Sequence, residues 1–153
     1  SHRRGLYTFW KRTSPPPNML TFDAGSREVC IARRLPTATP LQALVLLNDP
    51  QFVEAARGVA QRAFHEGGTE LGGRIGFIFR TLTGRRPIDR ELATLQDLYR
   101  EQYDEFRSGR SDALKLLAEG DAPRDPAIDP AECAALTVLA QALFNFDETV
   151  MNR

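Results

Sequence analysis

Residues 37–64 constrain the fold more than any other part of the chain, because they combine the densest apolar run with the clearest helix-start signals. Thr39, the proline after it and Gln42 form an N-cap, a first-turn proline and a capping-box partner. Asp49 and its following proline repeat the cap, and the residue before a proline is pushed out of the helical region. The stretch therefore predicts two helices that meet at a corner.

The two helices of this stretch differ in the arrangement of their apolar residues. The first, residues 40–48, is apolar on more than one side, which predicts a buried helix with Leu44 and Leu47 packed against Leu139 and Leu143. The second is amphipathic. Its apolar stripe is Phe52, Val53, Ala56, Val59, Ala60, Ala63 and Phe64. Its polar face is Glu54, Arg57, Gln61 and Arg62.

Four further helices are predicted by helical spacing and end signals, which makes six after residue 39 and an all-α fold. They are expected at residues 69–83, 88–107, 111–120 and 129–144, with Ser111 capping the third of them and Asp129 capping the last. Glycines at three positions weaken the helix at residues 69–83, which indicates close helix packing or a frayed start.

Residues 3–36 lack this regularity and are predicted to form an extended, aromatic and basic N-terminal arm that wraps the helical body of residues 37–153. The run Ser14–Pro17 predicts a stiff extended turn, and residues 27–34 a short extended piece. Ser1 and His2 are interpreted as a cloning scar.

The net charge of zero hides an asymmetry between the ends of the chain. Residues 1–34 hold seven basic and two acidic side chains, whereas residues 101–153 hold five basic and eleven acidic ones. The arm is therefore expected to dock on acidic surface, and a nucleic-acid partner is not expected, because nucleic-acid surfaces usually belong to net basic domains. The candidate interaction residues are Tyr7, Trp10, Lys11, Arg12, Arg33, Arg34, Asn48 and Asp49. For the last four, satisfying backbone groups is the alternative to binding a partner.

No catalytic, cofactor-binding or metal-binding residue is predicted. His65 falls in the last turn of a predicted helix, where a cation is favoured, and no second His or Cys stands at ligand spacing from it. The spacing of Cys30 and Cys133 fits two buried free thiols better than one long-range disulfide. No apolar run approaches the roughly 18 residues that a membrane span needs.

Five strings carry a family resemblance: RRGLYTFWKRTSPPP, FDAGSREVCIARR, TPLQALVLLNDPQFVEAAR, LTGRRP and NFDETV. Together they resemble the C-terminal part of the planctomycete-specific domain of unknown function that ends large cytochrome-c-containing proteins. The resemblance implies a fragment of a longer extracytoplasmic protein, with any haem in a separate domain. It also implies a capping threonine at position 88, where this chain has Ile88, so Asp89 is expected to take that role.

Two functions follow as hypotheses. The first is a helical structural or interaction module of a multidomain extracytoplasmic protein, with no enzymatic activity expected of this fragment. Its partner would be the rest of the parent chain, a haem c domain being one candidate. The alternative is a part of an enzyme or redox protein, acting on complex carbohydrate or coupled to a cytochrome c domain elsewhere in the parent chain.

Overall fold

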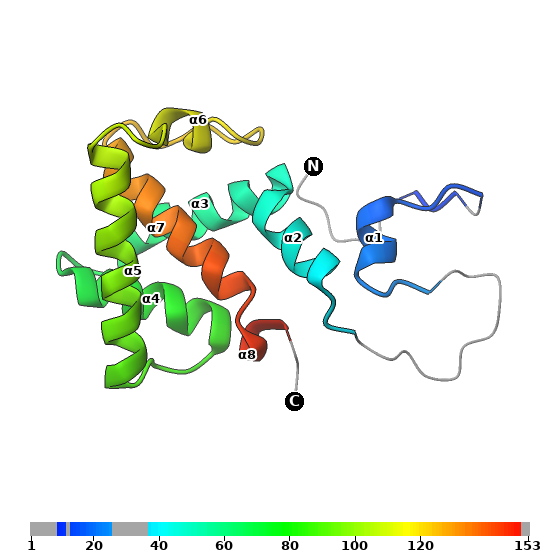
Figure 1. The fold of residues 1–153 in the computed structure, drawn as a ribbon, viewed down its shortest axis with the longest axis horizontal. Coiled ribbons are helices and arrows are strands. Elements are labelled where there is room, and N and C mark those ends of the chain that lie inside the picture. The colour runs from blue at the N-terminus through cyan, green and yellow to red at the C-terminus, as the bar shows by residue number, and fades with distance from the viewer. Residues whose placement is uncertain (1–8, 12, 26–36, 151–153) are drawn as a thin grey trace. The chain divides into compact units, whose positions relative to one another are not determined.

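The computed structural model describes residues 9–11, 13–25 and 37–150, and each regular element in this part of the chain is a helix, so the predicted all-α class is confirmed (Figure 1). The helices are α1 (Pro17–Thr21), α2 (Pro40–Asn48), α3 (Pro50–Glu66), α4 (Leu71–Thr83), α5 (Asp89–Arg107), α6 (Ala113–Leu117), α7 (Pro130–Phe144) and α8 (Asp147–Val150).

The six helices predicted after residue 39 are present as α2 to α7, whereas the sequence pattern does not predict α1 or α8. The expected extended turn ends one residue early. Pro16 keeps an extended backbone (φ −58°, ψ 126°), but Pro17 begins α1. Proline suits a first helical position because its missing N–H would have no partner within the helix.

The chain divides into two compact units, Ser1–Val45 and Leu46–Arg153, and the division falls within α2. In the first unit a polar clasp brings Asp23 and Thr37 together. The Asp23 carboxylate accepts hydrogen bonds from the Thr37 backbone N–H (2.7 Å) and hydroxyl (2.9 Å). The buried Gln42 amide donates to the Thr37 hydroxyl (2.9 Å) and to the Thr21 carbonyl (2.8 Å).

The second unit is built around α7, which packs against α3, α4, α5 and α6 (Figure 1). Its predicted inner face, Cys133, Leu136, Leu139, Ala140 and Leu143, is buried as expected. Ala134, Ala135, Thr137 and Gln141 are buried as well, so α7 is covered on nearly every side. The apolar stripe predicted for α3 contributes Val53, Ala56, Ala60 and Ala63 to the buried residues.

The predicted burial of α2 is wrong. Leu41 and Leu44 are each 57 % exposed and Leu47 is 45 % exposed, while Gln42 and Leu46 are the buried positions. Leu44 and Leu47 therefore do not fill a core beside Leu139 and Leu143. An apolar run shows only that a helix is able to lie inside a protein, and in this structure α7 is the helix that does so.

The predicted caps next to proline are confirmed. The Thr39 hydroxyl accepts from the Gln42 N–H (3.3 Å), and the Gln42 side chain accepts from the Thr39 N–H (2.9 Å), which completes the capping box of α2. Asp49 caps α3 by accepting from the Gln51 N–H (2.8 Å). Asp129 caps α7 through two backbone N–H groups.

Three other helix starts differ from the prediction. Asp112, and not Ser111, caps α6 by accepting from the Lys115 N–H (3.0 Å).

The expected cap Asp89 is the first residue of α5, and Ile88 is its N-cap. Ile88 has no side-chain acceptor, so Glu91 supplies the remaining half of a capping box by accepting from the Ile88 N–H (2.9 Å). α4 begins at Leu71 instead of Thr69.

Two charged residues of α3, Glu54 and Arg57, are buried, contrary to the expected polar face. The Arg57 guanidinium donates to the carbonyl of Leu117 at the end of α6 and to those of Glu119 and Ala122 in the α6–α7 connection. The Glu54 carboxylate accepts from the N–H groups of residues 121 and 122. A pair of buried charges thus holds this connection by its backbone, as buried charges require hydrogen-bonded partners.

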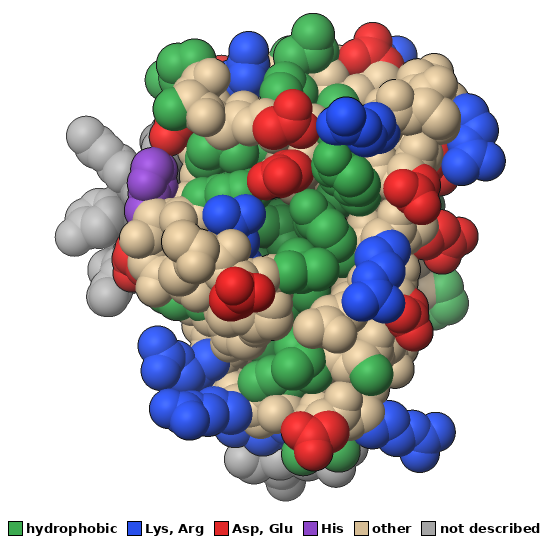
Figure 2. All heavy atoms as spheres, turned by 90° about the vertical axis from the view of Figure 1, so that its left-hand side faces the viewer, with side chains coloured by type: hydrophobic (Ala, Val, Ile, Leu, Met, Phe, Trp, Pro, Cys, Tyr) green, Lys and Arg blue, Asp and Glu red, His purple; other side chains and the backbone are tan. Residues whose placement is uncertain are grey.

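The α5 side of the second unit carries a half-buried apolar stripe beside a charged face, as predicted. In Figure 2 hydrophobic side chains run down the middle of this side, and acidic and basic side chains surround them. No helix within the described residues is both long and apolar enough to cross a membrane. Cys133 is buried as a free thiol, and burial raises its pKa to about 11. Cys30 lies outside the described residues.

Candidate functional site

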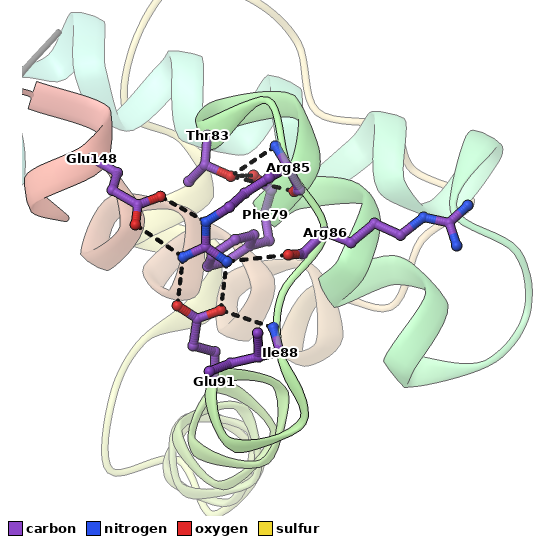
Figure 3. A network of polar contacts seen from close by, with 7 residues as sticks. All are labelled: Phe79, Thr83, Arg85, Arg86, Ile88, Glu91 and Glu148. Atoms are coloured by element: carbon purple, nitrogen blue, oxygen red, sulfur yellow. Dashed lines mark hydrogen bonds and ion pairs between the residues drawn. The ribbon is translucent and has the colours of Figure 1, made fainter. Parts of the chain in front are cut away.

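The connection from α4 to α5 holds a dense polar cluster centred on Arg85 (Figure 3). The Arg85 guanidinium lies between two carboxylates. Glu91 accepts from Nη1 (2.8 Å) and Nη2 (2.6 Å), and Glu148 of α8 accepts from Nε (2.8 Å) and Nη2 (3.0 Å). The backbone carbonyl of Arg86 accepts the fifth hydrogen bond, from Nη1 (3.1 Å). All five N–H groups of this guanidinium are therefore in use.

A ring contact and two shifted pKa values show that the members of this cluster interact strongly. The guanidinium carbon of Arg85 lies 4.8 Å from the centre of the Phe79 ring, which adds a cation–π contact. Hydrogen bonds from Arg85 and from the Ile88 N–H lower the pKa of Glu91 to about 2, and the two carboxylates raise the pKa of Arg85. The strings LTGRRP and NFDETV, which lie far apart in the sequence, meet at this cluster.

Arg86 points away from the cluster, although its carbonyl is part of it (Figure 3). Its backbone is held on one side by Arg85 and on the other by Pro87, whose ring fixes φ. The Arg85 cluster therefore holds the backbone from which the Arg86 side chain extends.

Arg86 lines an open hollow of about 430 Å³ at the junction of α3, α4 and the α4–α5 connection. We call it the glycine hollow. Its lining residues are Glu66, Gly67, Gly72, Gly73, Gly76, Phe77, Arg80, Arg86 and Pro87. Four of the nine are glycines, so much of its surface is bare backbone.

The glycines of the hollow differ in whether the packing of α4 against α3 requires them to lack a side chain. A Cβ at Gly67 would lie 2.9 Å from the Cα of Arg74, and one at Gly73 would lie 2.5 Å from the Gly67 carbonyl oxygen, so these positions allow α4 to approach the end of α3. A Cβ at Gly76 meets no atom within 4 Å. Packing therefore does not require glycine at position 76, where a side chain would extend into the glycine hollow.

The charges around the glycine hollow are unevenly compensated. Glu66 is paired with Arg62 (2.9 Å), which holds the pKa of this carboxyl below its usual value. Arg80 and Arg86 form no side-chain ion pair with any residue that the structure describes. The hollow thus presents an excess of positive charge beside exposed backbone. Such a surface is suited to bind an anionic or strongly polar group.

Four of the eight predicted interaction residues, Trp10, Lys11, Asn48 and Asp49, lie among the described residues. Asp49 uses its carboxylate to cap α3, and Asn48 is the exposed last residue of α2. Trp10 is half-buried, and the carbonyl of Lys11 accepts from the Ser14 N–H (3.1 Å). Tyr7, Arg12, Arg33 and Arg34 lie outside the described residues. Whether any of these residues binds a partner stays a prediction.

The glycine hollow is not predicted from the sequence, although the glycines that line it are visible there. Three glycines within five residues of one helix are unusual because each weakens the helix, and the prediction of close packing holds at Gly73. It does not hold at Gly76, where the space is open. The two arginines of the hollow, Arg80 and Arg86, stand near these glycines in sequence, but no spacing rule joins them.

His65 lies in the last turn of α3, as predicted, and its Nε2 is 3.0 Å from the Asp125 carboxylate. The hydrogen bond from the Ala127 N–H, and to a smaller extent the His65 contact, lower the pKa of Asp125. Over residues 9–11, 13–25 and 37–150, no three His, Cys, Asp or Glu side chains are grouped so that they could hold a metal ion.

The family model described as "PSD1: Protein of unknown function (DUF1553)" matches residues 1–99, which include α1 to α4, the Arg85–Pro87 segment and all nine residues that line the glycine hollow. Comparison with curated proteins and with solved structures gives no match. The expected membership of a family of unknown function is thereby confirmed. The chain belongs to the PSD1 family of proteins of unknown function.

Proposed function

We propose that this chain is a helical interaction module of a multidomain extracytoplasmic protein, and that it binds another part of that protein through the glycine hollow. The observation that carries the proposal is the hollow itself. It is open, it exposes backbone at Gly76 without a packing reason, and two arginines line it that form no ion pair with a described residue.

The polar chemistry elsewhere in the second unit supports this role. The largest polar clusters, around Arg85 and around Arg57, have their donors directed at other parts of the same chain. They hold connections and helix ends in place. Arg80 and Arg86 are different, because both are exposed residues that line the hollow and neither forms an ion pair with a described residue. Arg85 and Arg57 stabilise the fold by their contacts within the chain, whereas Arg80 and Arg86 are available for a partner.

The resemblance to a domain that ends large cytochrome-c-containing proteins suggests where to look for the partner. The other domains of the parent protein, including any haem c domain, would be close to this module at high effective concentration. A modest contact is then sufficient to hold them, because a linked partner binds in an intramolecular step.

The test compares two glycine substitutions in a binding titration. The 153-residue chain is titrated calorimetrically with the separately produced remaining domains of the parent protein. Gly76→Leu places a side chain in the hollow and replaces a poor helix former with a good one, so the fold is expected to be kept. Gly58→Leu is the matched control, because Gly58 is also helical and equally open but does not line the hollow.

The proposal predicts that Gly76→Leu abolishes binding and that Gly58→Leu leaves it unchanged, with both variants unfolding at or above the denaturant midpoint of the natural chain. Equal binding by the natural chain and the Gly76→Leu variant would contradict the proposal. Turnover of a polysaccharide by the isolated chain, lost on changing one carboxylate, would favour the enzymatic alternative instead.

A further inference from the structure

The residues that line the glycine hollow also indicate which chemical class of ligand it would bind. Two arginines line it, Arg80 of α4 and Arg86 of the α4–α5 connection, and the one acidic residue in its wall, Glu66, is paired with Arg62. Guanidinium is planar and offers parallel N–H groups that match the two oxygens of a carboxylate. The unmatched charge of the hollow is therefore of the kind that recognises oxyanions.

We infer that the partner of the glycine hollow is an acidic peptide segment, whose Asp or Glu carboxylates pair with Arg80 and Arg86 while its backbone lies along the glycines. This inference rests on the proposed function and names the chemical class of the partner. The bare backbone at Gly76, where a Cβ would meet no atom within 4 Å, permits a second chain to approach more closely than a side chain would allow.

A peptide fits the hollow better than an acidic polysaccharide. Phe77 is the one aromatic residue among the nine that line the hollow. The guanidinium carbon of Arg62 lies 5.4 Å from the centre of its ring and covers one face. Sugar rings pack their apolar faces on open aromatic rings, and this ring face is already used. The apolar edge of Phe77 and the ring of Pro87 suit the small contacts of a peptide backbone and its Cβ groups.

Arg85 is a positioning residue in this scheme. It touches no ligand, but its hydrogen bond to the Arg86 carbonyl and its pairing with Glu91 and Glu148 hold the segment that carries Arg86. Because α5 and α8 both hold the α4–α5 connection through the Arg85 cluster, the Arg86 side chain starts from a fixed backbone. Little ordering entropy is then lost when a carboxylate binds.

The experiment titrates the ¹⁵N-labelled chain with a blocked peptide, acetyl-Gly-Glu-Glu-Gly-amide, and follows the glycine amide and arginine Nε–H resonances by NMR. The same peptide with Gln in place of Glu and an oligogalacturonate of equal charge are the comparison ligands. We expect the Glu peptide to shift the resonances of the hollow and to bind at least about tenfold more tightly than the Gln peptide, since a charged hydrogen-bonded pair is lost in the latter.

Two arginine variants and one control test whether Arg80 and Arg86 supply the positive charge that binds the peptide. Arg80→Gln and Arg86→Gln should each weaken the Glu peptide about tenfold. Arg90→Gln changes the net charge equally at an exposed arginine outside the hollow, and it should leave the affinity unchanged. Added salt should weaken binding of the Glu peptide, because the paired charges remain in contact with solvent.

Equal binding of the Glu and Gln peptides would overturn the inference, as would an equal loss in Arg86→Gln and Arg90→Gln, which would indicate general charge attraction. Binding of oligogalacturonate alone would replace the peptide with a polysaccharide. If Gly76→Leu abolishes binding of the parent domains while both Arg80→Gln and Arg86→Gln bind them normally, the proposed function stands and the acidic-peptide inference fails.

Discussion

Arg85 shows how one side chain can organise a connection that lacks regular structure. Its five N–H groups reach Glu91, Glu148 and a neighbouring carbonyl, so three segments are held by a single planar group. Lysine could not replace it, because an ammonium has three donors and no planar fork. The α4–α5 connection is therefore held by one arginine whose five N–H groups all have acceptors.

The low pKa of Glu91, about 2, predicts an acid-sensitive contribution to stability. A carboxylate with a lowered folded-state pKa contributes fully above its ordinary pKa, and the contribution is lost as the pH falls towards the folded value. The difference in unfolding free energy between the natural chain and Glu91→Gln should therefore shrink from about pH 6 to about pH 2. Denaturant unfolding across this range measures it. A difference that does not change with pH would contradict the role given to the Arg85 cluster.

Substitution of Gly120 is expected to destabilise the fold through both backbone strain and a steric clash. Its φ is +88°, and a Cβ there would overlap the carboxylate of the buried Glu54. Gly109 has φ +74° with open space around it, so it is a matched control. Gly109→Ala should cost about 1–2 kcal/mol of unfolding free energy from backbone strain alone. Gly120→Ala should cost more, since it also displaces the α6–α7 connection from Glu54 and Arg57. Equal losses in thermal or denaturant unfolding would show that this connection is not held by α3.

At the scale of elements, α2 and α7 show why burial is hard to read from sequence. Both are apolar on several sides, and both begin with a capped proline. α7 is buried by four neighbouring helices, whereas α2 leaves Leu41, Leu44 and Leu47 exposed. The difference in burial depends on which helices pack against each side, and the sequence of a helix alone does not predict its neighbours.

Three substitutions should therefore fall in a fixed order of destabilisation. Leu136 is fully buried in α7, so Leu136→Ala should cost about 2–5 kcal/mol. Asp49→Ala removes one helix cap and should cost about 0.5–2 kcal/mol. Leu44→Ala changes an exposed side chain and should stay within about 0.5 kcal/mol of the natural chain. A loss for Leu44→Ala as large as that for Leu136→Ala would mean that α2 is buried after all.

Local chemistry could be predicted and long-range chemistry could not. Thr39, Asp49 and Asp129 were readable as caps because a cap involves residues within one turn of each other. Glu54 and Arg57 were assigned to the polar face because a charge on an amphipathic helix usually meets solvent. Their partners are backbone groups 60 to 68 residues away, which carry no sequence signal.

At the scale of the whole molecule, the candidate site is a product of several elements that are individually unremarkable in sequence. The glycines of α4 leave its surface bare, the end of α3 closes one side, and the Arg85 cluster holds the connection that carries Arg86. In the sequence, the glycines of α4 and the LTGRRP string are two separate features. The fold makes them one site by placing the start of α4 and the connection beyond its end around the same hollow.

The measurement that tests the central claim most directly is an NMR titration of the ¹⁵N-labelled chain with the remaining domains of its parent protein. Glycine amides are well resolved in such spectra and sample many parts of the chain. The account predicts shifts at Gly72, Gly73 and Gly76, and none at Gly58 or Gly109, which lie outside the hollow. Shifts centred on Gly58 or Gly109, or no shifts at saturating partner, would contradict the claim that this family member binds through the glycine hollow.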